Sequence, residues 1–387
     1  MRIFNCFFFF FLFSCNNTID LNNDGWVNSD DDVFVLKKKT KPYVLNDVLI
    51  IPENKTFYIE NGVHLILKKG GKIVNGGTLI LGKKNSNDSL YSFRLKESFL
   101  DSVFYYSVEL SSSSEKFIFS KENSLSGVFN INNTFLKNIN FSCYEKNKIN
   151  INNSVFNNSI INTENSNTNI SYSYFNKVII NKKNSSVVFN NSVFNNLKKP
   201  IYIDSSNSII NNCLFINSPK SLAFYNSHNN NILNSVFYKN NIGISIIKSG
   251  GGYYKFFNNI FIENNIVLNS IDSSSFYFMN NVFHKNNTVL KYKLNNNCEK
   301  PIISKNNIYY YNKINFDLEN IKISNSYCIS NIDSLEGYYN IYDNPLFINS
   351  NNFNYALNDS SPGLRSGINN LNLGVNINDI NIIKYLK

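Results

Sequence analysis

The chain repeats one short motif, an asparagine followed three residues later by an aromatic residue, through most of its middle part. Tyr172 with Phe175, and Asn306 with Tyr309, match it incompletely. Aromatic positions from 135 to 309 follow one another at steps of 19–26 residues. Such a period is typical of solenoids, in which each repeat forms one coil. The complete tetrads begin and end at Asn132 and Phe135, Asn153 and Phe156, Asn191 and Phe194, Asn212 and Phe215, Asn234 and Phe237, Asn258 and Phe261, and Asn280 and Phe283.

The segments between the tetrads have the length and composition of β-strands. Residues 187–189, 201–203 and 242–247 are β-branched and aromatic runs separated by Asn, Ser and Gly. No repeat holds the ten or more residues of a helical pattern. The sequence therefore predicts an all-β fold, a right-handed parallel β-helix with about 19–26 residues per coil. Equivalent positions would stack, giving an internal aromatic column and an Asn ladder hydrogen-bonded along the axis at a turn.

The abundance of asparagine, about a fifth of the chain, is compatible with this ladder. A disordered Asn-rich tract would not keep an aromatic residue in phase over nine repeats. Residues 1–14 are predicted to be a signal peptide, 15–40 a lipid-anchored linker, 41–370 the β-helix, and 371–387 a C-terminal cap or tail. Residues 83–130 are less periodic than the rest and indicate an insertion.

The first residues, MRIFNCFFFFFLFSC, have the pattern of a targeting signal. Arg2 precedes an apolar run at 7–13 that is too short to span a bilayer, as in a signal peptide. Leu12, Phe13 and Ser14 then precede Cys15, as in a bacterial lipobox, so Cys15 is the predicted lipidation site. An ordinary secretory signal with a coincidental cysteine is the alternative. We expect an outer-membrane lipoprotein of the cell envelope, facing the periplasm or the surface.

Cysteine spacing allows one disulfide. Cys298 and Cys328 lie about one long coil apart and could stack and pair in an oxidising compartment. Buried free thiols are an equally good interpretation of these two residues and of Cys143 and Cys213.

One loop near the lipid site matches a calcium-binding pattern. Oxygen-bearing side chains occupy loop positions 1, 3, 5, 9 and 12, with Gly25 at position 6. A hard cation such as Ca²⁺ takes several oxygen ligands, and glycine permits the sharp turn. An acidic linker without a metal is the alternative. The predicted ligands are Asp20, Asn22, Asp24, Asn28 and Asp31.

Charge does not indicate a nucleic-acid partner. The formal net charge is +10, but the only arginines are Arg2, Arg94 and Arg365. Binding of nucleic acid usually needs a concentrated basic face with arginine. Membrane attachment through the lipid, and a polysaccharide or envelope protein as partner, are the expected interactions.

Groups for polysaccharide cleavage are scarce in the repeats. No arginine lies between Phe135 and Tyr309, and carboxylates are few. One set of side chains, here called the runner-up catalytic column, is predicted to occupy equivalent positions in successive coils. It consists of Asp204, Asn226, Lys248 and Asp272, with His228 close to Asn226. Lys248 would be the base beside an acidic group. A solvated face with one ion pair is the simpler interpretation.

Two histidines and two aromatic runs are the remaining candidate functional residues. His64 and His284 are expected at the surface or in turns. In the runs at 253–257 and 309–311, alternate side chains must point outward from a strand, where tyrosines could stack on sugar rings.

Several of these motifs together resemble right-handed β-helix lipoproteins of Bacteroidota. They are the lipobox, the Gly-punctuated strands of residues 41–82, the Asn-Ser-Val-Phe coils, the Asp-Asn-Pro-Leu-Phe at 343–347 and the Asn-Asp-Ser-Ser-Pro-Gly at 358–363. The resemblance implies the fold and not an activity. We expect a noncatalytic lipoprotein that presents a β-helical face to a glycan, envelope component or protein; the alternative is a polysaccharide lyase or glycoside hydrolase.

Overall fold

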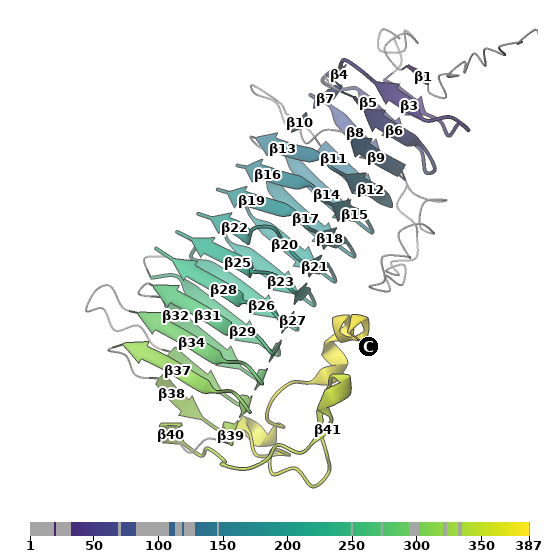
Figure 1. The fold of residues 1–387 in the computed structure, drawn as a ribbon. Coiled ribbons are helices and arrows are strands. Elements are labelled where there is room, and N and C mark those ends of the chain that lie inside the picture. Colours follow the sequence, from purple (N-terminus) through teal and green to yellow (C-terminus); the bar gives the residue numbers. More distant parts are fainter. Residues whose placement is uncertain are drawn as a thin grey trace, which may run out of the picture.

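The structure is a computed structural model of the whole chain. It describes residues 19–20, 32–68, 71–82, 108–112, 118–119, 128–144, 147–248, 251–271, 274–293, 302–319, 323–331 and 335–386. Within these residues the fold is a parallel β-helix, as predicted (Figure 1). Most coils contribute one strand in turn to sheet 2, sheet 1 and sheet 3, which are defined below.

Sheet 1 is built from short strands that all pair in parallel with the coil before and the coil after. Its strands are β1 (Ile19–Asp20), β3 (Tyr43–Leu45), β6 (His64–Leu67), β9 (Val108–Ser112), β12 (Thr134–Lys137), β15 (Val155–Asn157), β18 (Tyr174–Asn176), β21 (Val193–Asn195), β24 (Leu214–Ile216), β27 (Val236–Tyr238), β30 (Ile260–Ile262), β33 (Val282–His284), β36 (Ile308–Tyr310) and β39 (Ile329–Ser330).

Sheet 2 follows the same parallel pattern on a second side of the helix. Its strands are β2 (Val33–Leu36), β5 (Thr56–Ile59), β8 (Thr78–Leu81), β11 (Val128–Asn132), β14 (Lys148–Asn152), β17 (Asn167–Ser171), β20 (Val187–Asn190), β23 (Ser208–Asn211), β26 (Asn229–Leu233), β29 (Tyr253–Phe257), β32 (Ser275–Met279), β35 (Ile302–Lys305), β38 (Ile323–Ser326) and β40 (Gly337–Tyr338).

Sheet 3 forms the third side, and β4 (Val48–Ile51) pairs with β7 (Lys72–Asn75) in a separate two-stranded sheet. The strands of sheet 3 are β10 (Ile118–Phe119), β13 (Asn140–Tyr144), β16 (Ile160–Glu164), β19 (Ile179–Lys183), β22 (Ile201–Asp204), β25 (Lys220–Tyr225), β28 (Ile242–Ile247), β31 (Ile266–Ile271), β34 (Thr288–Lys293) and β37 (Ile314–Glu319).

Asparagine is abundant because the corners between sheets need left-handed backbone. Asn153, Asn158 and Asn165 have φ of 48°, 52° and 51°, one at each corner of their coil. Asn adopts this conformation at lower cost than most residues, because its short side chain can hydrogen-bond locally. The predicted Asn ladder is present: Nδ2 of Asn258 donates to Oδ1 of Asn234 at 2.7 Å.

The predicted aromatic column fills the core behind sheet 1. Successive rings are stacked with centroids 4.6–5.1 Å apart, at the spacing of the coils. Its first member differs from the prediction, because Leu136 and not Phe135 is in register with Phe156. Phe135 aligns with Val155 on the other side of the strand. The stacked rings are Phe156, Phe175, Phe194, Phe215, Phe237, Phe261, Phe283 and Tyr309.

A second amide ladder, which the sequence analysis did not anticipate, lies inside the helix. Asn240, Asn264 and Asn286 are buried. Each of Asn240 and Asn264 donates its backbone N–H to Oδ1 of the Asn one coil further on, at 3.0 and 2.9 Å. In earlier coils a serine plays this part, since Ser159 Oγ accepts the N–H of Ile139. Buried backbone N–H groups at the bends are thereby satisfied.

The end of the parallel helix differs from the expected range of 41–370. Parallel strands begin before residue 41, with β1 and β2, and end with β40 at Tyr338. The chain then forms an antiparallel pair, β41 (Phe347–Asn349) and β42 (Asn354–Leu357). Four 3₁₀ turns belong to this region: η3 (Ser350–Asn352), η4 (Ile368–Asn370), η5 (Ile377–Asp379) and η6 (Asn381–Tyr385).

Residues 347–386, here called the strap, turn back along the helix (Figure 1, yellow). They lie on the outer face of sheet 1, where Leu373, Ile380 and Ile382 join one buried apolar cluster with strand residues such as Val236 and Ile260. Residues 371–387 were predicted to be a cap or tail; the strap covers a side of the solenoid. No helix in the described residues is long and apolar enough to cross a membrane.

Candidate functional site

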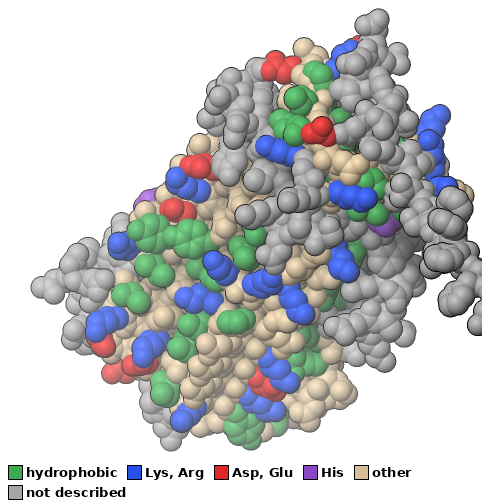
Figure 2. All heavy atoms as spheres, turned by 45° about the horizontal axis from the view of Figure 1, so that its top comes forward, with side chains coloured by type: hydrophobic (Ala, Val, Ile, Leu, Met, Phe, Trp, Pro, Cys, Tyr) green, Lys and Arg blue, Asp and Glu red, His purple; other side chains and the backbone are tan. Residues whose placement is uncertain are grey.

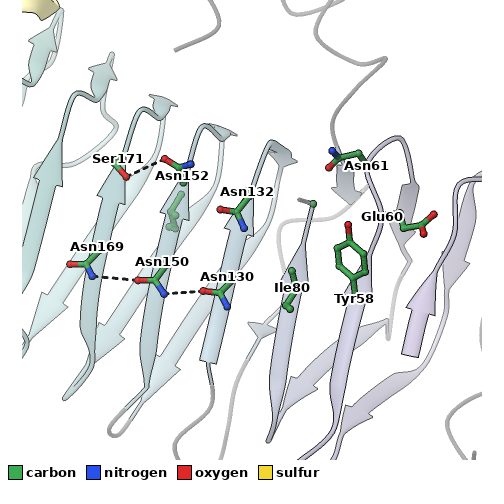
Figure 3. Close-up of a pocket in the computed structure, with 12 residues that line it drawn as sticks. Tyr58, Glu60, Asn61, Ile80, Asn130, Asn132, Asn150, Asn152, Asn169 and Ser171 are labelled. Atoms are coloured by element: carbon green, nitrogen blue, oxygen red, sulfur yellow. Dashed lines mark hydrogen bonds between the residues drawn. The ribbon is translucent and has the colours of Figure 1, made fainter. Parts of the chain in front are cut away.

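A long groove lies on the outer face of sheet 2. Its volume is about 1030 Å³, and it runs across β5, β8, β11, β14 and β17 (Figure 3). Strand alternation turns the apolar residues of these strands inward, so polar residues are left on the outside. The residues that line it are Tyr58, Glu60, Asn61, Ile80, Gly82, Asn130, Asn132, Asn150, Ile151, Asn152, Asn169 and Ser171.

An amide ladder forms the floor of the groove. Nδ2 of Asn150 donates to Oδ1 of Asn130 at 2.9 Å, and Nδ2 of Asn169 donates to Oδ1 of Asn150 at 3.3 Å. Beside it, Oγ of Ser171 donates to Oδ1 of Asn152 at 3.2 Å (Figure 3). An amide offers two donors and one acceptor oxygen, so each rung keeps hydrogen-bonding capacity for a ligand after bonding its neighbours. The floor is therefore uncharged and rich in both donors and acceptors.

At the N-terminal end of the groove stand an aromatic ring and a carboxylate. Tyr58 lies on β5, and Glu60 follows that strand (Figure 3). Burial, and then the negative charge of Glu60, raise the pKa of Tyr58. Gly82 has φ of +66°, and a Cβ there would collide with the backbone oxygen of Asn132. Glycine at this position thus lets neighbouring coils approach closely below the groove.

Sheet 3 carries a second, charged face. Lys183 Nζ lies 2.8 Å from Glu164 Oε1, and this hydrogen bond is the main cause of the raised pKa of Lys183. The rings of Tyr202 and Tyr225 are stacked with centroids 6.2 Å apart. Glu164, Lys183 and Tyr202 are among the residues that line a smaller hollow of about 260 Å³.

The runner-up catalytic column is not assembled as predicted. Asp204 is in register with Tyr225, while Lys248 follows Ile247, the partner of Tyr225. Lys248 Nζ instead lies 5.8 Å from the centre of the Tyr225 ring. Asp204 therefore belongs to a neighbouring column, because it lies ten residues after its column aromatic, as Tyr225 and Ile247 do, whereas Asn226 and Lys248 lie eleven residues after theirs.

The other members of that column give no further support to a catalytic centre. His228 is exposed, and its backbone oxygen accepts the N–H of Tyr253. Asp272 lies outside the described residues.

A buried lysine was missed by the sequence analysis. Lys182 on β19 is fully buried, in register with Thr163 of the previous coil. Its Nζ donates to Oγ1 of Thr168 and to the backbone oxygen of Ser166. Burial lowers the pKa of Lys182 to about 7. Strand alternation was a usable signal, because Lys182 shares the inward side of β19 with Ile180.

The remaining polar predictions have mixed outcomes. His284 is buried and not at the surface, and its Nδ1 lies 3.0 Å from Oη of Tyr355 in the strap. Cys328 is a free buried thiol, and Cys298, with which it could pair, lies outside the described residues. Cys143 and Cys213 are free and buried as well.

The predicted calcium loop and lipidation site fall almost wholly outside the described residues. This holds for Cys15, Asn22, Asp24, Asn28 and Asp31, while Asp20 is placed only as backbone in β1. Elsewhere in the described residues, no three His, Cys, Asp or Glu side chains form a group able to hold a metal ion.

The run at 253–257 alternates as expected on sheet 2, whereas Tyr309 and Tyr310 of the second run are both buried and Tyr311 is exposed. Tyr253 and Phe257 point outward, with 37% and 40% of their surface exposed, while Tyr254 and Phe256 are buried. On the face shown in Figure 2, basic side chains are dispersed among acidic, apolar and other polar ones. That face has no single concentrated basic field within the part of the chain drawn in colour.

Comparisons with known proteins assign the chain to no family and no activity. No protein-family model matches the chain, and no curated protein matches it. A solved structure of the periplasmic alginate epimerase AlgG is 12% identical, with a TM-score of 0.35 over 84% of this chain and 82% of that one. A variant of the same epimerase gives 12% identity and a TM-score of 0.38 over 81% and 83%. Identities and TM-scores this low say nothing about activity.

Proposed function

We propose that the protein is a noncatalytic, envelope-attached β-helix that binds a glycan chain in the groove of sheet 2. The observation that carries this proposal is the amide ladder from Asn130 to Asn169. Neutral donors and acceptors repeat along it at the coil spacing of about 4.8 Å. Such a surface complements hydroxyl groups that recur along a polysaccharide.

The N-terminal end of the groove is suited to the same ligand. The Tyr58 ring offers a flat apolar surface beside polar groups, a combination suited to a sugar ring with its hydroxyl edge. A glycan that enters the groove exchanges water for amide and hydroxyl partners, so the polar floor is not left unsatisfied.

The described residues that line the groove include too few carboxylates for hydrolysis by a pair of them. Both retaining and inverting glycosidases require a pair of Asp or Glu residues. Glu60 is the one carboxylate among the described lining residues. This favours binding over cleavage, and a lyase or hydrolase stands as the alternative that the experiment must separate.

The test uses the full chain and a panel of neutral polysaccharides, and measures both retention and newly formed chain ends. Asn150→Asp places a carboxylate against Oδ1 of Asn130 and should weaken retention roughly tenfold. Asn181→Asp is the matched control, because Asn181 donates to Asn162 at 2.8 Å in the same kind of ladder on sheet 3. Equal effects of both variants would remove the groove from the proposal; new chain ends would replace binding by catalysis.

We place the protein in the cell envelope through a lipid on Cys15, with calcium bound by the loop of residues 20–31. Support comes from the lipobox and from the spacing of oxygen-bearing side chains. Mass spectrometry of the N-terminal peptide should show a diacylglycerol that Cys15→Ser abolishes. Calorimetry should show one Ca²⁺ site that Asp24→Ala removes; heat signals identical for the two proteins would exclude the site.

A further inference from the structure

The column that holds the groove amides continues along sheet 2, but its later residues are of other types, including apolar, basic and aromatic ones. By strand register, Asn169 is followed by Val188, Ile209, Asn231, Lys255 and Tyr277. All of these share one outward-facing column, and the last two stand on β29 and β32. Four coil steps, about 19 Å, separate Asn169 from Lys255.

The outer surface around Lys255 is here called the aromatic platform. It is formed by Tyr253, Lys255, Phe257, Tyr277 and Lys305. The rings of Tyr253 and Tyr277 lie 6.2 Å apart, and Lys255 Nζ lies 5.4 Å from the centre of the Tyr253 ring. Phe257 extends the apolar surface on the same strand. The Tyr253 and Phe257 rings are exposed beside this ammonium group, and the Tyr277 ring is half-buried.

Among the described residues, Lys255 and Lys305 have no acidic partner of the kind that lysines have on sheet 3. On sheet 3, Lys291 and Lys293 lie 3.4 and 3.2 Å from Asp317 and Glu319 of the next coil. Strands β26, β29, β32, β35 and β38 of sheet 2 contain no Asp or Glu. The positive charge of Lys255 and Lys305 is therefore not compensated across these strands.

We propose that the platform is a second subsite of the same binding face, which takes acidic sugars of a polysaccharide lying along the helix axis. This inference rests on the proposed glycan-binding function. A sugar ring packs against Tyr253 or Tyr277, and its carboxylate or sulfate pairs with Lys255 or Lys305. The uncharged amide floor takes neutral hydroxyl edges of the same chain.

The geometry sets the length of the ligand. From Asn130 to Tyr277 the column makes seven coil steps, about 34 Å. Only an extended oligosaccharide reaches both subsites at once, and binding at two linked sites raises the affinity above that of either alone. Short fragments should bind weakly, and affinity should rise steeply once the chain spans both.

The test compares a carboxylated polysaccharide with its carboxyl-reduced derivative, using the full chain and measuring affinity by titration calorimetry. The acidic polymer should bind roughly tenfold more tightly, and the difference should shrink as salt rises. Lys255→Gln together with Lys305→Gln should lower the affinity for the acidic polymer to that for the reduced polymer. Lys293→Gln, an exposed lysine of β34 on sheet 3, is the matched control.

Two outcomes separate this inference from the function on which it rests. If the reduced polymer binds, and Asn150→Asp weakens it, but no preference for the acidic polymer exists, the second subsite is wrong and the groove stands. If the reduced polymer does not bind at all, the proposed function itself fails. A preference that survives the double lysine variant, or that Lys293→Gln also removes, likewise overturns the subsite.

Discussion

The side-chain amide of Asn258 makes two hydrogen bonds to the backbone of Asn376, 118 residues later in the chain. Its Oδ1 accepts the N–H of Asn376 at 2.6 Å, and its Nδ2 donates to the oxygen of Asn376 at 3.2 Å. The same corner column holds the strap at two other coils, where Asn212 accepts the N–H of Ile382 and Asn306 that of Ile368. The residues that build the corners thus also fasten the strap.

Breaking this attachment should lower stability. Asn258→Ala removes both bonds to the strap, while Asn280→Ala changes the same corner column at a residue that also has φ of 57°. The left-handed backbone penalty is common to the two variants. Urea unfolding should show Asn258→Ala to be less stable by about 1–2 kcal/mol more than Asn280→Ala. Equal losses would mean that the strap bonds contribute nothing measurable.

Lys182 should make the folded protein less stable at low pH. Its pKa is lowered from 10.5 to about 7 by burial, so between these values the unfolded chain binds more protons. The free energy of unfolding should therefore rise as pH increases from 7 toward 10.5; below pH 7 Lys182 is protonated in both states, so its destabilising effect is complete and no longer varies with pH. Lys182→Met should stabilise the protein at pH 6 by about 2–4 kcal/mol and flatten that rise. The neighbouring exposed Lys183→Met is the control, with a small change at every pH.

His284 should oppose folding in acid for the same physical reason. Its pKa is lowered from 6.5 to about 4, by burial and then by Lys285, while Glu263 and the phenols of Tyr310 and Tyr355 are the other titratable groups nearby. The unfolded chain binds the extra proton between pH 6.5 and 4, so stability is lost as pH falls through that range.

The check for His284 is a comparison with His284→Gln by thermal unfolding. The wild type should lose stability relative to the variant between pH 6.5 and 4, and the difference should be constant above pH 7. An NMR titration in which the imidazole protonates near pH 6.5 would contradict the prediction.

The aromatic stack should be the most sensitive part of the core. Phe215 is fully buried and stacks on Phe194 and Phe237 at 4.9 and 4.6 Å. Phe215→Ala should cost about 3–5 kcal/mol, because it removes the transfer energy of the ring and leaves a cavity between two neighbours. Phe257→Ala, at an outward position, should change the free energy of unfolding by less than about 0.5 kcal/mol.

The period of the Asn and aromatic residues was sufficient to predict the coils, the ladder and the stack. It failed at Phe135, because an apolar residue on both sides of the strand made the register ambiguous by one position. The groove was not predicted, since the outward Asn residues of β11, β14 and β17 carry no motif of their own. They become a site only when register brings Asn130, Asn150 and Asn169 into one column.

The strap was not predicted either, although the sequence held a signal for it. Strands such as Leu214–Ile216 and Ile260–Ile262 are apolar at every position, which indicates burial on both faces. The identity of the covering segment could not be read from the chain, because 3₁₀ turns have no strong period. Lys182 and His284 were misjudged for a related reason: polar residue types are usually exposed, and only the packing shows otherwise.

The strap also affects the order in which the molecule can be completed during synthesis. Each coil can pair with the one before it as it emerges, so a solenoid needs mostly short-range contacts. Ile382, however, meets Asn212 across 170 positions of sequence. The apolar outer side of the middle coils therefore remains uncovered until those later residues arrive, and during that interval it is a surface for chaperones or for aggregation.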